Sequence, residues 1–290
     1  MTHAVAIVPA FNRADTVGAT VTALRTVSDV LDVIVVDDGS RDRTAAVAAA
    51  AGARVIELAR NRGKGAAITA GIAASGAPDV YLLIDADLGA SAALAGDLLQ
   101  PVALGDADMT IAVFDAPDGR GGLGLVKGFA ARVLRSQTGL DMAEPLSGQR
   151  AVRGPLLRSL QLAPGFGLEI GLTLDAANRD AVISEIAVGF THRQTGRDLS
   201  GIAHRARIGR HVYLAVVART GWPKAMYCLA ASLLGRVISA ARRVPVGHRG
   251  RRLGLAARAR WRRARRLRLP RALRDLRSRR PWRRRTPHGS

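Results

Sequence analysis

Residues 80–88 read VYLLIDADL, an apolar run that ends on two aspartates. Five consecutive apolar residues are typical of a strand that is buried on both faces of a parallel sheet. Asp85 and Asp87 would point to opposite faces of a regular strand, so both can serve one site only if the strand ends there. The following Leu88-Gly89 permits that turn. The stretch therefore predicts a parallel sheet with two carboxylates at the end of one strand.

The rest of the first half alternates strands and helices in the order expected of βαβ units. We expect strands at 4–8, 33–36, 54–58 and 80–84, with helices at 15–27, 42–51 and 63–75 between them. Further strands are predicted at 109–113 and 182–188 and further helices at 126–135 and 167–178. Ligands of open parallel sheets bind beyond the carboxyl ends of the strands. Three polar clusters, at 9–12, 37–40 and 85–87, should therefore meet in one crevice.

The chemistry of these clusters favours a phosphorylated ligand. Carboxylate oxygens suit a hard cation such as Mg²⁺ or Mn²⁺, and such a cation bridges phosphates. Lys64 follows a glycine at a predicted helix start, where it could meet a phosphate, or it could be a solvated lysine. Asp38 could bind a base or ribose, or Asp38-Gly39-Ser40 could be only a turn. Asp85 and Asp87 could likewise cap the next helix.

The sequence lacks the residue spacing of two common nucleotide-binding motifs. The first strand leads into Pro9-Ala10-Phe11-Asn12 and not into a glycine-rich dinucleotide fingerprint. Gly63-Lys64-Gly65 lacks both the spacing and the following Ser or Thr of an NTPase phosphate loop.

The net charge of +21 belongs mainly to one end of the chain. Residues 241–290 contain 20 Arg and one acid, so they account for +19 of it. We therefore expect one α/β domain at 1–200, a helical extension at 201–240, and an Arg-rich tail at 241–290 that is disordered or peripheral. The tail could contact an anionic membrane, whereas specific nucleic-acid binding through Trp261 and Trp282 is less favoured.

The compartment expected from the sequence is the cytoplasm, with the inner face of the membrane as a peripheral location. The single cysteine, Cys228, cannot form an internal disulfide, and the first residues lack a secretory signal. The apolar stretch at 225–240 is too short to span a bilayer and carries Arg236.

Four motifs in order resemble those of family 2 glycosyltransferases. They are Ile7 to Asn12 (IVPAFN), Val35 to Ser40 (VVDDGS), Asn61 to Gly65 (NRGKG) and Asp85 to Leu88 (DADL). The resemblance implies a GT-A fold, a Rossmann-like and mostly parallel sheet flanked by helices, here with a C-terminal helical basic extension. It also implies a nucleoside-diphosphate-sugar donor, with UDP-glucose expected. Donor-binding residues would be Pro9, Ala10, Asn12, Asp38, Lys64 and Asp85, with Asp85 and Asp87 at the metal.

Two later motifs narrow the resemblance to the glucosyl-3-phosphoglycerate synthases. They are Glu144 to Arg150 (EPLSGQR) and Ala163 to Gly171 (APGFGLEIG), followed by His192-Arg193 after the last strand. By this resemblance Leu146, Ser147 and Gly148 border the sugar, His192 is the third metal ligand, and Asp87 and Glu169 are the candidate catalytic residues. Glu169 could bind sugar hydroxyls, act as a base, or pair with a buried Arg.

The acceptor is the least defined partner. The synthases carry an Arg and a Thr in a loop that holds phosphoglycerate, whereas this chain reads Gly121-Gly122-Leu123-Gly124. Arg120, Gly121, Gly122 and Arg193 are the acceptor candidates, for a small phosphorylated or carboxylated molecule. Polyprenyl-phosphate glycosyltransferases are the rival group, because they share the Ser147-Gly148 turn and a basic segment after the last strand. An inactive nucleotide-sugar-binding protein is the alternative of another class, and a homodimer is a further expectation.

Overall fold

The core of the fold is a seven-stranded sheet with the order β3-β2-β1-β4-β6-β5-β7. The computed structural model describes residues 2–114, 124–191 and 199–241. The strands are β1 (Ala4–Ala10), β2 (Val30–Asp37), β3 (Arg54–Glu57), β4 (Val80–Leu83), β5 (Met109–Phe114), β6 (Arg150–Arg153) and β7 (Ile183–Val188). Among these strands β6 alone is antiparallel to its neighbours, β4 and β5. The predicted α/β fold with a mostly parallel sheet is confirmed.

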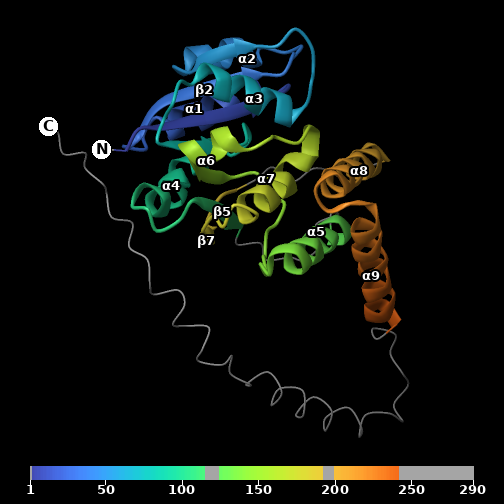
Figure 1. The fold of residues 1–290 in the computed structure, drawn as a ribbon. Helices are drawn as coiled ribbons and strands as arrows, with labels where there is room; N and C mark the ends of the chain where they lie inside the picture. Colours follow the sequence, from blue (N-terminus) through green and yellow to red (C-terminus); the bar gives the residue numbers. More distant parts are fainter. Residues whose placement is uncertain (1, 115–123, 192–198, 242–290) are drawn as a thin grey trace, which may run out of the picture. The chain divides into compact units, whose positions relative to one another are not determined.

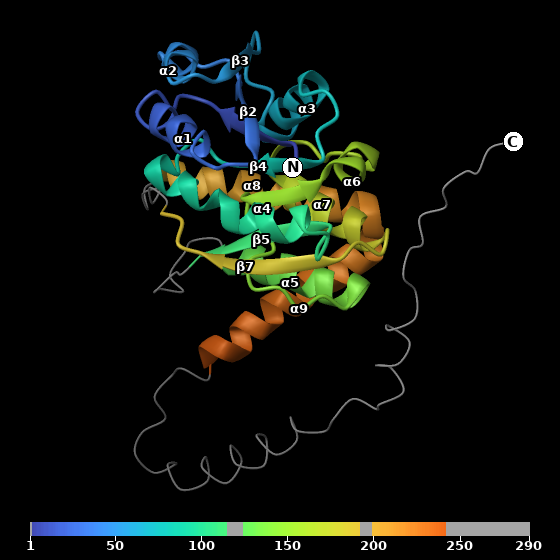
Figure 2. The same ribbon diagram turned by 90° about the vertical axis from the view of Figure 1, so that its left-hand side faces the viewer.

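Helices cover both faces of this sheet (Figure 2). They are α1 (Val17–Leu24), α2 (Thr44–Ala50), α3 (Lys64–Ala74), α4 (Ala95–Ala103), α5 (Gly124–Thr138), α6 (Gly154–Ser159), α7 (Leu168–Ala177), α8 (Leu199–Thr220) and α9 (Trp222–Ala241), with 3₁₀ turns η1 (Gly89–Leu94) and η2 (Gly165–Gly167). Strand alternation divides the core into two clusters: Val8 of β1 belongs to the cluster that includes buried residues of α1, α2 and α4, and Ile7 to the cluster that includes buried residues of α3 and α5 to α9. Successive residues of one buried strand therefore lie in two different hydrophobic clusters, one on each face of the sheet.

The sequence predictions missed the helix between β4 and β5. Glycine at 89 takes a φ of +54°, and Pro101 lies inside α4. Both residues normally interrupt helices, so the helical spacing of apolar residues in 89–103 was not recognised as a helix. The amphipathic packing of Leu98, Leu99 and Val102 onto the sheet outweighs the proline. The short α6 was also not predicted.

Two helices, α8 and α9, occupy most of residues 199–241. Gly221, with a φ of +82°, separates α8 from α9, and Val212, Val216, Ala225 and Cys228 are buried in the main core. Helices α5, α7 and α8 lie side by side (Figure 1). The compact unit that contains the sheet ends at Val237, and the predicted domain boundaries at 200 and 240 stay predictions. No helix in the described ranges combines the length and apolarity needed to cross a membrane.

Candidate active site

The loops after β1 and β2 are joined by hydrogen bonds. Asn12 has a φ of +51°, which lets its backbone N–H donate to Ser40 Oγ at 2.8 Å while its Oδ1 accepts the N–H of Arg41 at 2.9 Å. Pro9 and Ala10 end β1, in register with Val36 and Asp37 of β2. The first two polar clusters thus meet at one edge of the sheet, as predicted.

Asp38 connects this edge to the start of α3. Its carboxylate is 4% exposed, and its two oxygens accept the backbone N–H groups of Arg62 and Gly63, both at 2.7 Å. Gly39 permits the close approach, because a Cβ there would lie 2.7 Å from the carbonyl carbon of Arg60. Asp38 therefore fixes the backbone just before Lys64. Its contact with a nucleoside stays a prediction.

Lys64 lies between two carboxylates from distant parts of the chain. Its Nζ is 2.6 Å from Asp85 Oδ1 and 2.9 Å from Glu169 Oε1, and its side chain is 16% exposed. Burial alone would lower the pKa of Lys64, but Asp85 and Glu169 outweigh burial and raise that pKa above its usual value. The lysine is therefore an ammonium at neutral pH, and it is held at the strand ends.

Gln149 fixes the orientation of Asp85. Its Nε2 donates to Asp85 Oδ2 at 2.9 Å, and its Oε1 accepts the backbone N–H of Asp85 at 3.1 Å. Gln149 is 1% exposed and immediately precedes β6, where Arg150 pairs with Leu83 of β4. The sequence predictions did not assign this residue, and its position inside the Glu144 to Arg150 motif was the only available signal.

Arg150 holds the turn that contains Leu146, Ser147 and Gly148. The guanidinium is buried and donates to the carbonyl oxygens of Ser147 at 2.8 Å and Pro145 at 3.3 Å. It also donates to Thr173 Oγ1 of α7 at 2.9 Å. Burial lowers the pKa of Arg150 to about 10, with Glu169 and Glu185 acting against it, so the side chain stays charged at neutral pH. This cation joins the turn to the helix that carries Glu169.

Glu185 of β7 supports the same turn from its other end. Its carboxylate accepts the backbone N–H groups of Ala143 at 2.8 Å and Glu144 at 2.7 Å. The segment that leads into Ser147-Gly148 is thus attached to β7 as well as to α7.

Gly148 faces the lysine and the aspartate directly. A Cβ at this position would lie 2.3 Å from Lys64 Nζ and 2.8 Å from Asp85 Oδ2. Beside it, Ser147 Oγ is buried and has no hydrogen-bond partner among the described residues. A buried hydroxyl without a partner beside two charged groups suits a polar ligand that supplies the missing contact.

Gly148→Ala should therefore lower turnover about 10- to 100-fold, because the methyl group would separate Lys64 from Asp85. Steady-state rates with a saturating concentration of the sugar nucleotide that the motifs predict would measure the effect. Gly128→Ala on α5 is the matched control, since a Cβ there meets nothing within 4 Å. Wild-type turnover in the Gly148 variant would show that this close contact is unimportant.

The described residues fit a divalent metal in part. Asp85 contacts Lys64 Nζ through Oδ1 and Gln149 Nε2 through Oδ2, and carboxylate oxygens of this kind are the ligands that Mg²⁺ and Mn²⁺ prefer. Asp87 follows two residues later, also after β4. Within the described ranges no group of three or more His, Cys, Asp or Glu side chains is gathered for a metal. The predicted third ligand, His192, lies outside these ranges, as do Arg120, Gly121, Gly122 and Arg193.

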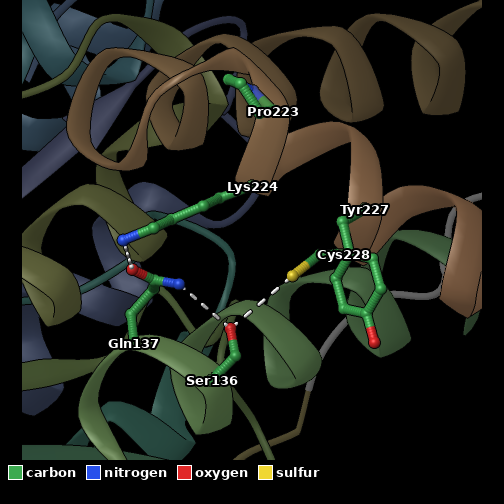
Figure 3. A pocket seen from close by; sticks show the side chains of 6 residues that line it. All are labelled: Ser136, Gln137, Pro223, Lys224, Tyr227 and Cys228. Carbon is green, nitrogen blue, oxygen red and sulfur yellow. Dashed lines mark hydrogen bonds between the residues drawn. The ribbon is translucent and has the colours of Figure 1, made fainter.

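A separate pocket lies between α5 and α9, away from these carboxylates. Ser136, Gln137, Pro223, Lys224, Tyr227 and Cys228 line it (Figure 3). Lys224 Nζ contacts Gln137 Oε1 at 3.5 Å, and Ser136 Oγ lies 3.6 Å from Cys228 Sγ. This pocket holds none of the residues that the motifs single out, so the chemistry is assigned to the strand ends.

Comparisons with known proteins agree with the geometry. The family model of glycosyl transferase family 2 matches residues 5–135. Glucosyl-3-phosphoglycerate synthase of Mycolicibacterium paratuberculosis is 32% identical over 75% of this chain and 72% of its own. The corresponding synthase of Mycolicibacterium smegmatis is 30% identical over 74% of this chain and 77% of its own.

Solved structures give the same result. Glucosyl-3-phosphoglycerate synthase from Mycobacterium tuberculosis in complex with Mn²⁺, UDP-glucose and phosphoglyceric acid is similar with a TM-score of 0.65 and 28% identity. The match covers 76% of this chain and 80% of that one. A structure of the same enzyme with Mg²⁺ and UDP has a TM-score of 0.64 and 26% identity. The chain therefore belongs to glycosyl transferase family 2, has the GT-A fold, and is a glycosyltransferase related to the glucosyl-3-phosphoglycerate synthases.

Proposed function

We propose that this enzyme transfers glucose from UDP-glucose to the hydroxyl of 3-phosphoglycerate, with Mg²⁺ or Mn²⁺. The observation that carries the proposal is the ammonium of Lys64 between Asp85 and Glu169 at the carboxyl ends of the strands. Relatives at 30–32% identity are named as synthases of glucosyl-3-phosphoglycerate, and a solved relative holds Mn²⁺, UDP-glucose and phosphoglyceric acid together.

The residues of the cluster have distinct roles in this proposal. Lys64 supplies a fixed positive charge for the diphosphate of the donor, whose negative charge grows as the glycosidic bond breaks. Asp85 and Asp87 would hold the metal, and that metal would neutralise the same charge when bound. Gln149 and Arg150 keep Asp85 and the Ser147-Gly148 turn in place, so little reorganisation is needed during the reaction.

Glu169 is assigned a positioning role in this proposal. Its Oε1 faces the ammonium of Lys64 at 2.9 Å, and its side chain is 7% exposed. A carboxylate that is buried against a lysine is better placed to orient that lysine or a sugar hydroxyl than to take a proton from the acceptor. One sequence-based alternative paired Glu169 with a buried Arg; its ion pair is instead with Lys64, and Arg150 acts on it through charge.

The test is an acceptor screen with the full chain. UDP release from UDP-glucose should depend on Mn²⁺ or Mg²⁺ and should rise when 3-phosphoglycerate is added. The product should carry glucose on the acceptor, which mass spectrometry would show. Transfer to a polyprenyl phosphate but not to 3-phosphoglycerate would replace the proposed acceptor, and no release from any sugar nucleotide would overturn the proposal.

Asp87→Asn should weaken binding of UDP in the presence of Mn²⁺ about 100-fold, because the amide removes one anionic metal ligand. Titration calorimetry with and without Mn²⁺ would separate the metal-dependent part of the affinity. Asp97→Asn on the first turn of α4 is a control carboxylate outside the cluster. An unchanged metal-dependent affinity in the Asp87 variant would place the metal elsewhere.

Two further partners remain proposals from the sequence. The Arg-rich tail is proposed to contact anionic membranes from the cytoplasmic side, and the chain to form a homodimer. Cosedimentation of the full chain and of a chain ending at residue 241 with anionic and neutral vesicles would test the first. Light scattering would test the second.

A further inference from the structure

A glycine-rich segment, Ala163 to Gly167, lies between the start of α3 and helix α8. On the α3 side, a Cβ at Gly65 would lie 2.4 Å from the carbonyl oxygen of Ala163, and a Cβ at Gly63 would lie 3.6 Å from Gly165 Cα. The two backbones are therefore in direct contact on either side of Lys64. The same segment leads into α7, whose second residue is Glu169. Its position thus affects both partners of the Lys64–Glu169 ion pair.

On its other side the segment rests on His211 of α8. The backbone N–H of Phe166 donates to His211 Nδ1 at 3.3 Å, and the rings of Phe166 and His211 stack with centroids 6.0 Å apart. Gly165 has a φ of +58°, and a Cβ on it would lie 2.4 Å from His211 Nδ1. Gly167 also packs closely on α8, since a Cβ there would be 2.7 Å from Ala215 Cβ and 2.8 Å from the carbonyl oxygen of His211. The imidazole thus fills the space that a side chain at Gly165 would need, and the backbone of α8 fills the space beside Gly167.

We propose that His211 is a positioning residue for glucose transfer, which holds the segment 163–167 against Gly63-Lys64-Gly65 and so keeps Lys64 and Glu169 in contact. The proposal rests on the proposed function, because it assigns His211 to the cluster that binds the donor. His211 acts on that cluster through the backbone of residues 163–167.

The contact requires the neutral imidazole. Nδ1 accepts a hydrogen bond, so the proton of neutral His211 is assigned to Nε2, and a second proton on Nδ1 would remove the acceptor. Burial lowers the pKa of His211 below 6.5, and the nearby Arg210 and Arg207 lower it further. The neutral form is therefore favoured in the folded protein, and the contact is lost as the pH falls through this lowered pKa.

The other charged groups around α8 have partners of their own. Segment 163–167 carries no titratable side chain. The charged residues of the helices packed against this segment or α8 form their own contacts: Lys64 with Glu169, Asp175 with Arg219, Lys127 with Glu144, Arg135 with Asp141, and Arg132 with Ser232. Among the described residues, Arg207 and Arg210 are the charges that shift the pKa of His211.

The experiment compares two variants of His211 in the full chain. His211→Phe keeps a ring against Phe166 but has no acceptor, and we expect kcat/KM for UDP-glucose to fall about tenfold. His211→Asn places an amide oxygen near the position of Nδ1 and does not titrate, so we expect kcat/KM to stay within about threefold of wild type at pH 8. Wild type should lose activity as the pH falls through the lowered pKa of His211, which lies below the usual value, and His211→Asn should not show this loss.

His3→Phe is the matched control, because His3 is exposed and its hydrogen bonds with Asp79 and Val80 are made by its backbone. Circular dichroism would show whether each variant is folded. Unchanged kcat/KM in folded His211→Phe, or an acid loss that persists in His211→Asn, would overturn the proposal. If wild type transfers no glucose from UDP-glucose, the proposed function fails instead, and the affinity for UDP with Mn²⁺ across the same variants and pH values then decides the role of His211.

Discussion

Lys64→Met is expected to lower kcat/KM for UDP-glucose about 10²- to 10³-fold, the usual cost of removing one fixed group that stabilises charge in a transition state. The side chain of methionine has similar length and fills the same space, but it leaves Asp85 and Glu169 without the ammonium that contacts both. Two carboxylates that share a partly buried site repel each other, and they would also repel the diphosphate. Initial rates over a range of UDP-glucose concentrations would measure the loss.

Lys224→Met is the matched control for this variant. Lys224 is an exposed lysine of α9, and its Nζ contacts only Gln137, at 3.5 Å, among the described residues. It should keep the wild-type rate. Glu169→Gln should have a smaller effect than Lys64→Met, because Asp85 still holds the ammonium. A Lys64 variant with a rate within about threefold of wild type would mean that another group neutralises the diphosphate.

The charge on Lys64 should not limit the rate at alkaline pH. Burial would lower the pKa of the lysine, but Asp85 and Glu169 together raise it above the usual 10.5. A raised pKa means that the stabilisation from this ion pair is present below 10.5 and is lost only as the pH rises through the higher value of the folded protein. Deprotonation of Lys64 should therefore cause no loss of activity below about pH 10.

Arg150→Met is expected to lower the free energy of unfolding by about 2–4 kcal/mol. The variant removes a buried charge together with its desolvation cost, and this change by itself stabilises the folded state. It also leaves the carbonyl oxygens of Ser147 and Pro145 and the hydroxyl of Thr173 without the donor that now satisfies them. Three lost contacts, two of them to buried backbone, outweigh one desolvation cost. The midpoint of urea unfolding and Tm would both fall, Tm by about 4–16 °C.

Arg153→Met on the same strand is the control for Arg150. Arg153 pairs with Asp108 at 2.8 Å with its side chain 56% exposed, so solvent screens the pair and the loss should be under about 1 kcal/mol. Equal stability losses in the two variants would contradict the role given to burial. The Arg150 variant should also lose activity, since the Ser147-Gly148 turn loses its anchor.

Much of the catalytic cluster could be predicted from the sequence. Asp85 follows a run that is typical of a buried strand, and Lys64 follows a glycine at a helix start, so the sheet rules place both at one edge. Glu169 and the Ser147-Gly148 turn came from motif resemblance. The glycines of the cluster can be seen in the sequence, but the sequence does not show why glycine is needed at these positions. Gly65 and Gly148 are explained only by the atoms that a Cβ would meet.

Other parts could not be predicted because they depend on pairing between distant segments. Gln149 is a neutral amide with no pattern of its own, and it reaches Asp85 only because β6 runs antiparallel to β4. An arginine is normally expected at the surface, yet Arg150 is 1% exposed. His211 lies in a long basic helix, and nothing local distinguishes it from the neighbouring Arg207 and Arg210.

The sequence by itself determined the parallel sheet, the edge where its polar loops gather, and the family, because strand periodicity and ordered motifs are local properties of the chain. Only the tertiary structure decided how those residues are used. The ammonium of Lys64 is shared by two carboxylates, Asp38 holds the backbone before it, and Gln149, Arg150 and His211 support the cluster in roles that the sequence did not predict. The reason is physical, since ion pairs and buried hydrogen bonds depend on distances between segments, and these distances exist only after β4, β6, α7 and α8 have packed together.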